Sequence, residues 1–283
     1  MNKTLVFFIF IISGGILPHA SSYSVDTTQS YETNKRIIAL SPHLTEIVYA
    51  LEQQTYLVGV SDYSDFPPEA SELPTVASYQ GANIASIIRL QPSHILVWQG
   101  GNKDADIQRL REQGFNIYLS SIATPQDLVS DIRNIGAFLN STKKANILAN
   151  NLEAKLRALN DERKNLRSVV YYLNKVPMVG LGNDPWLNSL LNLCHLENIY
   201  HDKVQAYPQL NIADIIRRQP EIIIAANGST YDLERSFWEA HSRVLKKTSV
   251  LMINPDAMHR FTPRAIDETI RLCNLVKQTN LND

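Results

Sequence analysis

Short apolar runs alternate along the chain with segments whose apolar residues recur at helical spacing. Runs of this kind predict buried strands, and apolar residues at i, i+3 and i+4 predict helices with one buried face. In the first half, strands are expected over residues 35–42, 56–61, 94–98 and 115–120, with helices over 43–51, 84–90 and 103–113. This alternation favours parallel strand pairing and a doubly wound sheet.

The second half repeats the same order of elements. Strands are expected over residues 169–173, 221–226 and 249–254, with helices over 187–200, 212–218 and 262–278. Residues 83–98 and 211–226 are identical at nine of sixteen positions, so one helix-turn-strand unit occurs once in each half. The fold class is therefore predicted as α/β, with two doubly wound Rossmann-like lobes that face each other and hold a ligand in the cleft between them.

Residues 124–166 lie between the two halves and contain almost no Gly or Pro after Pro125. From Thr142 onward this segment predicts one long, rigid helix of roughly 36 Å, at about 1.5 Å per residue. The predicted organisation is an N-terminal lobe over 36–123, a connecting helical segment over 124–166 and a C-terminal lobe over 167–283.

Composition and charge narrow the class of protein. The chain has 283 residues, of which 44% are hydrophobic and 19% charged, as in a folded globular protein. A formal net charge of −1 provides no basic surface for nucleic acid or anionic membranes. Residues 1–20, with Lys3 before an apolar run, predict a secretory signal peptide and so an exported protein, and an uncleaved membrane anchor is the alternative.

Cys194 and Cys273 are the only cysteines of the chain. In an oxidising compartment an even pair usually forms a disulfide, whereas two buried free thiols are the alternative. The sequence contains no GxSxG or HExxH motif, and its seven histidines are scattered without metal-ligand spacing. We therefore expect neither an enzyme nor a metal site.

Four aromatic residues lie in loops after predicted strands or at element ends, where a doubly wound lobe presents its binding edge. Each offers about 150–250 Å² of surface, so together they favour a bulky, partly flat ligand. The alternative is that each is an ordinary core or rim residue. The four are Tyr63, Tyr79, Trp98 and Trp238.

At these positions the chain resembles the periplasmic vitamin B12-binding proteins, two-lobed proteins with a rigid connecting helix that deliver cobalamin to an ABC importer. The resemblance runs from about Arg36 to the C-terminus. The segments that carry it are LSPHLTE, GVSDYSDFPPEA, QGANI, LQPSHILVWQGGN, ENIY and NPDAMHRFTPR.

The resemblance implies a ligand site, a compartment and partners. Cobalamin is then a transported ligand and not a cofactor. The partners are the permease and ATPase subunits of the importer, the location is the periplasm, and a monomer is expected. The family also pairs the cysteines that match Cys194 and Cys273. The implied ligand-binding residues are Tyr63, Tyr79, Gln80, Gly81, Trp98, Trp238, Asp256 and Arg260.

Three departures from the family pattern keep alternatives open. Tyr79 stands where the cobalamin-binding relatives carry Trp, and Val179 stands where a further aromatic residue is expected. Heme-binding relatives use a tyrosine near the position of Tyr79 as an iron ligand. Heme is therefore the second candidate ligand, and an iron-siderophore the third. The class docks on its importer through glutamates at the positions of Ala85 and Ala213, so we expect docking to use other acids, with Asp214 as the candidate. A merely solvated Asp214 is the alternative.

Overall fold

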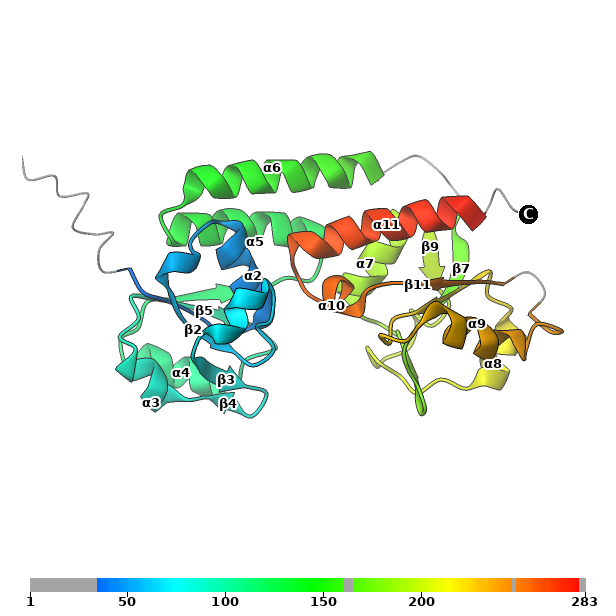
Figure 1. The fold of residues 1–283 in the computed structure, drawn as a ribbon, viewed down its shortest axis with the longest axis horizontal. Helices are drawn as coiled ribbons and strands as arrows, with labels where there is room; N and C mark the ends of the chain where they lie inside the picture. Colours follow the sequence, from blue (N-terminus) through cyan, green and yellow to red (C-terminus); the bar gives the residue numbers. More distant parts are fainter. Residues whose placement is uncertain (1–34, 160–164, 246–247, 280–283) are drawn as a thin grey trace, which may run out of the picture. The chain divides into compact units, whose positions relative to one another are not determined.

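Two β-sheets organise the chain, one in each half (Figure 1). The computed structural model describes residues 35–159, 165–245 and 248–279, which belong to one compact unit. The predicted signal peptide, residues 1–20, lies outside the described residues. The α/β class with two sheets is confirmed.

The first sheet has the strand order β4-β3-β2-β1-β5-β6. Its strands pair in parallel except for the antiparallel pair β3–β4, a hairpin that the sequence did not predict. The strand order changes direction between β1 and β5, which makes their carboxyl ends the topological switch point of the sheet. The strands are β1 (Ile37–Ala39), β2 (Leu57–Ser61), β3 (Thr75–Ser78), β4 (Gly81–Ala82), β5 (His94–Trp98) and β6 (Ile117–Ser120), and the helices are α2 (Pro42–Ala50), η1 (Gln54–Tyr56), η2 (Pro68–Glu72), α3 (Ile84–Arg89) and α4 (Asp104–Glu112).

The second sheet has the order β11-β10-β7-β8, and β9 also pairs with β7. The predicted helix over 187–200 is too long, because α7 ends at Leu193 and His195 adopts a left-handed φ of 57°. The residues after this break form β9, in parallel with β7. The elements are β7 (Arg167–Lys175), β8 (Met178–Gly180), α7 (Pro185–Leu193), β9 (Leu196–Asn198), α8 (Ile212–Arg218), β10 (Ile222–Ala225), α9 (Tyr231–Glu239), β11 (Ser249–Met252), α10 (Pro255–Met258) and α11 (Pro263–Thr279).

The segment between the sheets consists of two helices, α5 (Pro125–Phe138) and α6 (Thr142–Leu159), which lie side by side (Figure 1). Gly136 permits this approach, since a Cβ atom there would lie 2.0 Å from that of Ala145. The long helix begins at Thr142 as predicted, but residues 165–166 are not helical, so the expected 36 Å is too long. The 18 residues of α6 span about 27 Å at 1.5 Å per residue.

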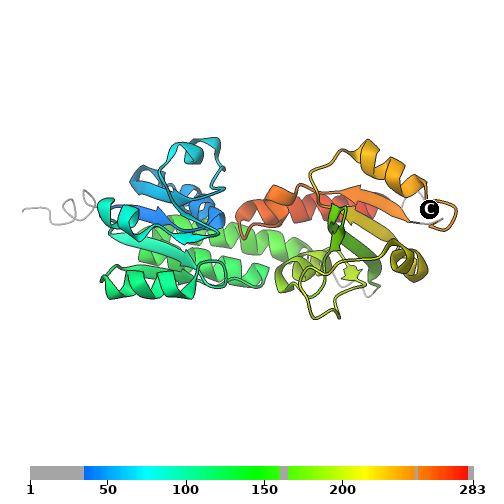
Figure 2. The ribbon, with the colours of Figure 1, turned by 90° about the horizontal axis from the view of Figure 1, so that it is seen from below.

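One cluster of buried apolar residues takes members from both halves of the chain. It includes Leu44 of α2, Ile132 of α5, Leu152 of α6, Leu190 of α7 and Ile266 of α11. Figure 2 shows α11 extending from the second half toward the helices of the first. Two further clusters of buried apolar residues each belong to one half, one around Ile95 of β5 and one around Tyr172 of β7.

Cys194 and Cys273 form the predicted disulfide, with their Cα atoms 4.6 Å apart. The bond joins the C-terminal end of α7 to α11. Both side chains are buried in the cluster shared by the two halves. The disulfide therefore fixes α11 to the lobe that carries the second sheet.

Candidate functional site

Trp98 stands at the end of β5, beside the switch point of the first sheet. The Asn102 side chain accepts a hydrogen bond from the Trp98 backbone N–H at 2.7 Å and donates one to the Leu40 carbonyl at 2.7 Å. A Cβ atom at Gly101 would lie 1.7 Å from the Trp98 ring, so glycine is required where this loop passes the indole. The GGN sequence after the strand thus holds the Trp98 ring in place.

The Trp98 ring belongs to an aromatic cluster with members from both halves. Its centroid lies 5.3 Å from His43 and 5.5 Å from Phe261, and Phe261 lies 5.0 Å from Trp186, all in edge-on contacts that aromatic pairs favour. The sequence predicted only Trp98. His43, Phe261 and Trp186 carry no local pattern that distinguishes them from other core residues.

His43 is a buried histidine on the first-half side of this cluster. Its Nδ1 lies 3.1 Å from the Ser41 hydroxyl, whereas its Nε2 has no hydrogen-bond partner among the described residues. Burial lowers the pKa of His43 to about 3, because the surrounding aromatic rings do not solvate an imidazolium. The ring is therefore neutral at physiological pH.

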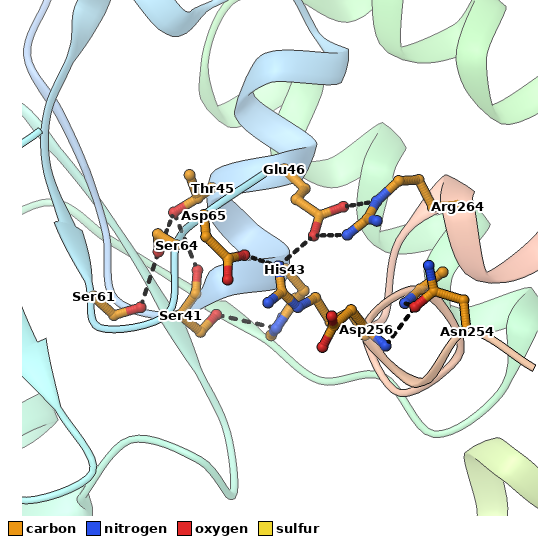
Figure 3. Close-up of polar contacts among 12 residues, drawn as sticks. Ser41, His43, Thr45, Glu46, Ser61, Ser64, Asp65, Asn254, Asp256 and Arg264 are labelled. Carbon is orange, nitrogen blue, oxygen red and sulfur yellow. Dashed lines mark hydrogen bonds and ion pairs between the residues drawn. The ribbon is translucent and has the colours of Figure 1, made fainter. Parts of the chain in front are cut away.

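Arg264 binds Glu46 of α2 (Figure 3). Arg260 also binds Glu46, so both arginines join the second half to α2. Arg264 contacts both Glu46 carboxylate oxygens, with Nε at 2.8 Å and Nη2 at 2.6 Å. Arg260 Nη1 lies 3.0 Å from Glu46 and 2.7 Å from Asp65. We call these four residues the interlobe ion-pair cluster.

The interlobe ion-pair cluster also orders the loop that follows β2. The hydrogen bond from Arg260 lowers the pKa of Asp65, and the Arg264 guanidinium lies 3.6 Å from the centre of the Phe66 ring. Arg260 was predicted to reach polar groups of a ligand. In the structure, two carboxylates of the first half already bind its guanidinium.

Tyr63 and Tyr79 lie on the surface of the first half, 76% and 83% exposed. Tyr63 follows β2 with a left-handed φ of 60°, and Tyr79 lies in the turn between β3 and β4. The Gln80 side chain donates a hydrogen bond to the Tyr79 hydroxyl at 3.1 Å, and Gly81 has a φ of 128°. Large aromatic side chains this exposed are available for ligand contact.

Trp238 is not brought together with these residues, because α9 directs it into the core of the second sheet. Its side chain is 3% exposed, and its indole N–H donates to the Tyr172 hydroxyl at 3.2 Å. Tyr172 in turn donates to the buried Glu234 carboxylate, which also binds Lys175. This indole therefore presents little surface to a ligand.

Tyr207 is an exposed aromatic residue of the second half that was not among the predicted ligand-binding residues. Its hydroxyl donates to Asp184 at 2.8 Å, and the other oxygen of Asp184 caps α7 through the Leu187 N–H at 2.8 Å. In the sequence, Tyr207 stands immediately before Pro208, which favours a loop and so an exposed ring. Being 48% exposed, Tyr207 offers the kind of ring surface expected of Trp238.

Asp256 lies in the short helix α10, and His259 follows its last residue. Asp256 is exposed in its first turn, where Asn254 caps the helix by accepting the Asp256 N–H at 3.0 Å (Figure 3). His259 Nε2 lies 2.7 Å from the hydroxyl of buried Tyr171, and burial lowers the pKa of His259. The segment thus places a carboxylate and an imidazole close to Arg260 in the sequence.

The duplicated helices α3 and α8 are capped by equivalent residues, Asn83 and Asn211. Asp214 on α8 accepts hydrogen bonds from Arg217, from Arg218 Nε at 2.9 Å and from the Tyr200 hydroxyl at 2.9 Å. These donors, Arg217 first, lower the pKa of Asp214 to about 2. The acid predicted to dock is ionised but already bound by its neighbours.

A pocket of about 780 Å³ lies elsewhere, between α9, β11 and α11. Trp238 lines it, whereas Tyr63, Trp98 and Arg260 do not. Within the described residues, no group of three His, Cys, Asp or Glu side chains is arranged to bind a metal ion. No helix in this part of the chain has the length and apolar character needed to cross a membrane.

Comparisons with known proteins show which family the chain belongs to. The sequence profile described as periplasmic binding protein matches residues 37–242. The vitamin B12-binding protein of Vibrio parahaemolyticus serotype O3:K6 is 31% identical over 249 residues, covering 87% of this chain and 90% of that protein. Its counterpart in Vibrio cholerae serotype O1 is 32% identical over 250 residues, covering 86% and 89%.

Solved structures give the same picture. The periplasmic vitamin B12 binding protein BtuF of Vibrio cholerae aligns with a TM-score of 0.77 and 30% identity, covering 87% of this chain and 98% of that one. The periplasmic heme binding protein HutB of Vibrio cholerae aligns with a TM-score of 0.71 at 22% identity, covering 86% and 98%. At that identity the second similarity shows the fold alone.

Proposed function

Because this chain belongs to the periplasmic binding protein family, we propose that it captures cobalamin in the periplasm between its two lobes and delivers it to an ABC importer. The observation that carries the proposal is the set of aromatic residues at or just after the carboxyl ends of β2, β3 and β5, namely Tyr63, Tyr79 and Trp98. The named relatives that are 30–32% identical over most of the chain favour cobalamin over other ligands of the fold.

Cobalamin fits the chemistry of these residues. A corrin ring has two broad apolar faces, which pack on aromatic side chains, and a rim of amide groups, which need hydrogen-bond partners. Gln80 and Asp256 are exposed polar groups that suit such a rim, and Tyr207 supplies ring surface from the second half. Arg260 contributes to the site by ordering the loop of Tyr63 through Asp65.

The proposed role is binding and delivery, without turnover of the ligand. The partners are the permease and ATPase subunits of the importer, and the protein acts as a monomer. Docking uses the duplicated helices α3 and α8, where Ala85 and Ala213 are exposed. Because Asp214 is already bound by two arginines and a tyrosine, we expect its contribution to docking to be small.

Separate additions of hydroxocobalamin and hemin to the purified protein test the ligand. Retention of one equivalent of hydroxocobalamin, read from its visible absorbance after gel filtration, is the expected result. Trp98→Ala should weaken binding by about 2–4 kcal/mol, the range for removing a buried aromatic anchor. Absence of hydroxocobalamin retention, or unchanged affinity in Trp98→Ala, would contradict the proposal.

Heme is the second candidate because Tyr79 presents an exposed phenol hydroxyl, the group that ligates iron in some heme proteins. If hemin is retained, Tyr79→Phe should change the visible spectrum of the bound heme while leaving most of the affinity. If hemin passes through unbound, heme is ruled out. An iron-siderophore is then the remaining alternative within the family, tested in the same assay.

A further inference from the structure

The turn that carries Tyr79 and Gln80 has little support from its own hairpin. Ser78 pairs with Gly81 and Ala77 with Ala82, so β4 is two residues long and the loop consists of Tyr79 and Gln80 alone. A hairpin this short is not stable by itself. Its exposed tip must therefore be held by contacts with another element.

Those contacts come from the first turn of α4. Asp106 Oδ2 accepts the Ala82 backbone N–H at 2.9 Å, on the strand immediately after the turn. Lys103 Nζ donates to the Gln80 carbonyl at 2.6 Å, within the turn itself. Together these two hydrogen bonds fix the residues immediately before and after Gly81, namely Gln80 and Ala82.

Gly81 is shaped to fit this carboxylate. Its φ of 128° is a backbone conformation that other residues rarely adopt, and a Cβ atom there would lie 2.6 Å from Asp106 Oδ2. Asp106 is buried, whereas Asp104 on the same helical turn is exposed. The buried carboxylate thus lies directly against the backbone of the turn.

We infer that Asp106 is a positioning residue for ligand binding, which orients Tyr79 by fixing the hairpin backbone and does not itself touch the ligand. This inference rests on the proposed function, because it takes Tyr79 to contact the ligand. The α4 carboxylate fixes the backbone on one side of the two-residue turn from which the Tyr79 side chain projects.

Three variants separate this role from a general effect on folding. Asp106→Ala removes the acceptor, Asp106→Asn keeps a carbonyl oxygen in its place, and Asp104→Ala is the matched control on the same turn. Hydroxocobalamin binding should weaken about tenfold in Asp106→Ala, as expected for loss of a hydrogen bond to a charged group. It should stay within about threefold of wild type in Asp106→Asn and be unchanged in Asp104→Ala.

A double-mutant cycle with Tyr79→Ala tests whether Asp106 acts through Tyr79. On the Tyr79→Ala background, Asp106→Ala should have no further effect on affinity, because the side chain it positions is gone. An equal loss with and without Tyr79 would overturn the inference, as would wild-type affinity in Asp106→Ala.

Amide hydrogen exchange of the ligand-free protein tests the positioning independently of the ligand. The Ala82 amide should exchange at least about tenfold faster in Asp106→Ala than in Asp104→Ala, since only the first loses its acceptor. Equal exchange in the two variants overturns the inference. If wild type binds no corrinoid, the proposed function fails, and this exchange measurement alone decides whether Asp106 holds the turn.

Discussion

Glu46 offers the sharpest test of how the two halves are joined. Its side chain is 3% exposed and accepts hydrogen bonds from Arg260 and from both Nε and Nη2 of Arg264. Glu46→Gln preserves the shape of the side chain but removes the charge that compensates two guanidinium groups. The perturbation therefore acts on electrostatics more than on packing.

The expected loss of unfolding free energy depends on the partners and solvent contact that Arg260 and Arg264 keep in Glu46→Gln. Removing one partner of a buried ion pair costs about 3–5 kcal/mol, because the other charge is left uncompensated. Here Arg260 keeps Asp65, and the two arginine side chains are 14% and 24% exposed, so water recovers part of the loss. We expect Glu46→Gln to lower the free energy of unfolding by about 3 kcal/mol, and the melting temperature by about 6–12 °C for a chain of this size.

Urea unfolding at pH 7, followed by circular dichroism and fluorescence, measures the effect. Glu153→Gln is the matched control, because Glu153 also faces two arginines, Arg133 at 2.8 Å and Arg157 at 3.8 Å, but on the surface of α6. Solvent screens that pair, so the control should unfold like wild type. If Glu46→Gln unfolds within about 1 kcal/mol of the control, the ion-pair cluster does not stabilise the junction between the halves.

Two further predictions concern the disulfide and His43. Replacing both Cys194 and Cys273 by serine should lower the free energy of unfolding by about 4 kcal/mol, since the bond closes a long loop in the unfolded chain; urea unfolding that matches wild type would contradict this. Because the folded protein keeps His43 neutral down to about pH 3, only the unfolded chain takes up a proton there as the pH falls through about 6.5. Lowering the pH from 8 to 5 should therefore reduce the free energy of unfolding of wild type by about 2 kcal/mol more than that of His43→Gln. If the free energy of unfolding changes equally with pH in the two proteins, His43 can be protonated in the folded state.

The sequence predicted most of the regular structure because the relevant signals are local. Apolar runs placed the strands from His94 to Trp98 and from Ile222 to Ala225, and the duplicated segment placed α3 and α8. These elements follow from residues within a few positions of one another. The pairing of Cys194 with Cys273 also followed, because the chain has no other cysteine.

The candidate site was predicted less completely, because the role of a side chain depends on partners distant in the sequence. Arg264 meets Glu46 across 218 positions, and Asp106 holds a turn 24 positions away. Neither contact has a local signature. Only the packed structure shows that Arg260 is bound by two carboxylates and Asp214 by two arginines.

The sequence by itself thus determined where aromatic residues follow strands, and the tertiary structure decided which of them are exposed. Tyr63 and Tyr79 extend into solvent from short loops, whereas Trp238 lies on a helix whose inner face packs on the second sheet. The physical reason is that burial is a property of the complete packing arrangement. An indole on a helix is buried when that side of the helix packs on a sheet. The residues of the helix itself do not show which sheet it packs on.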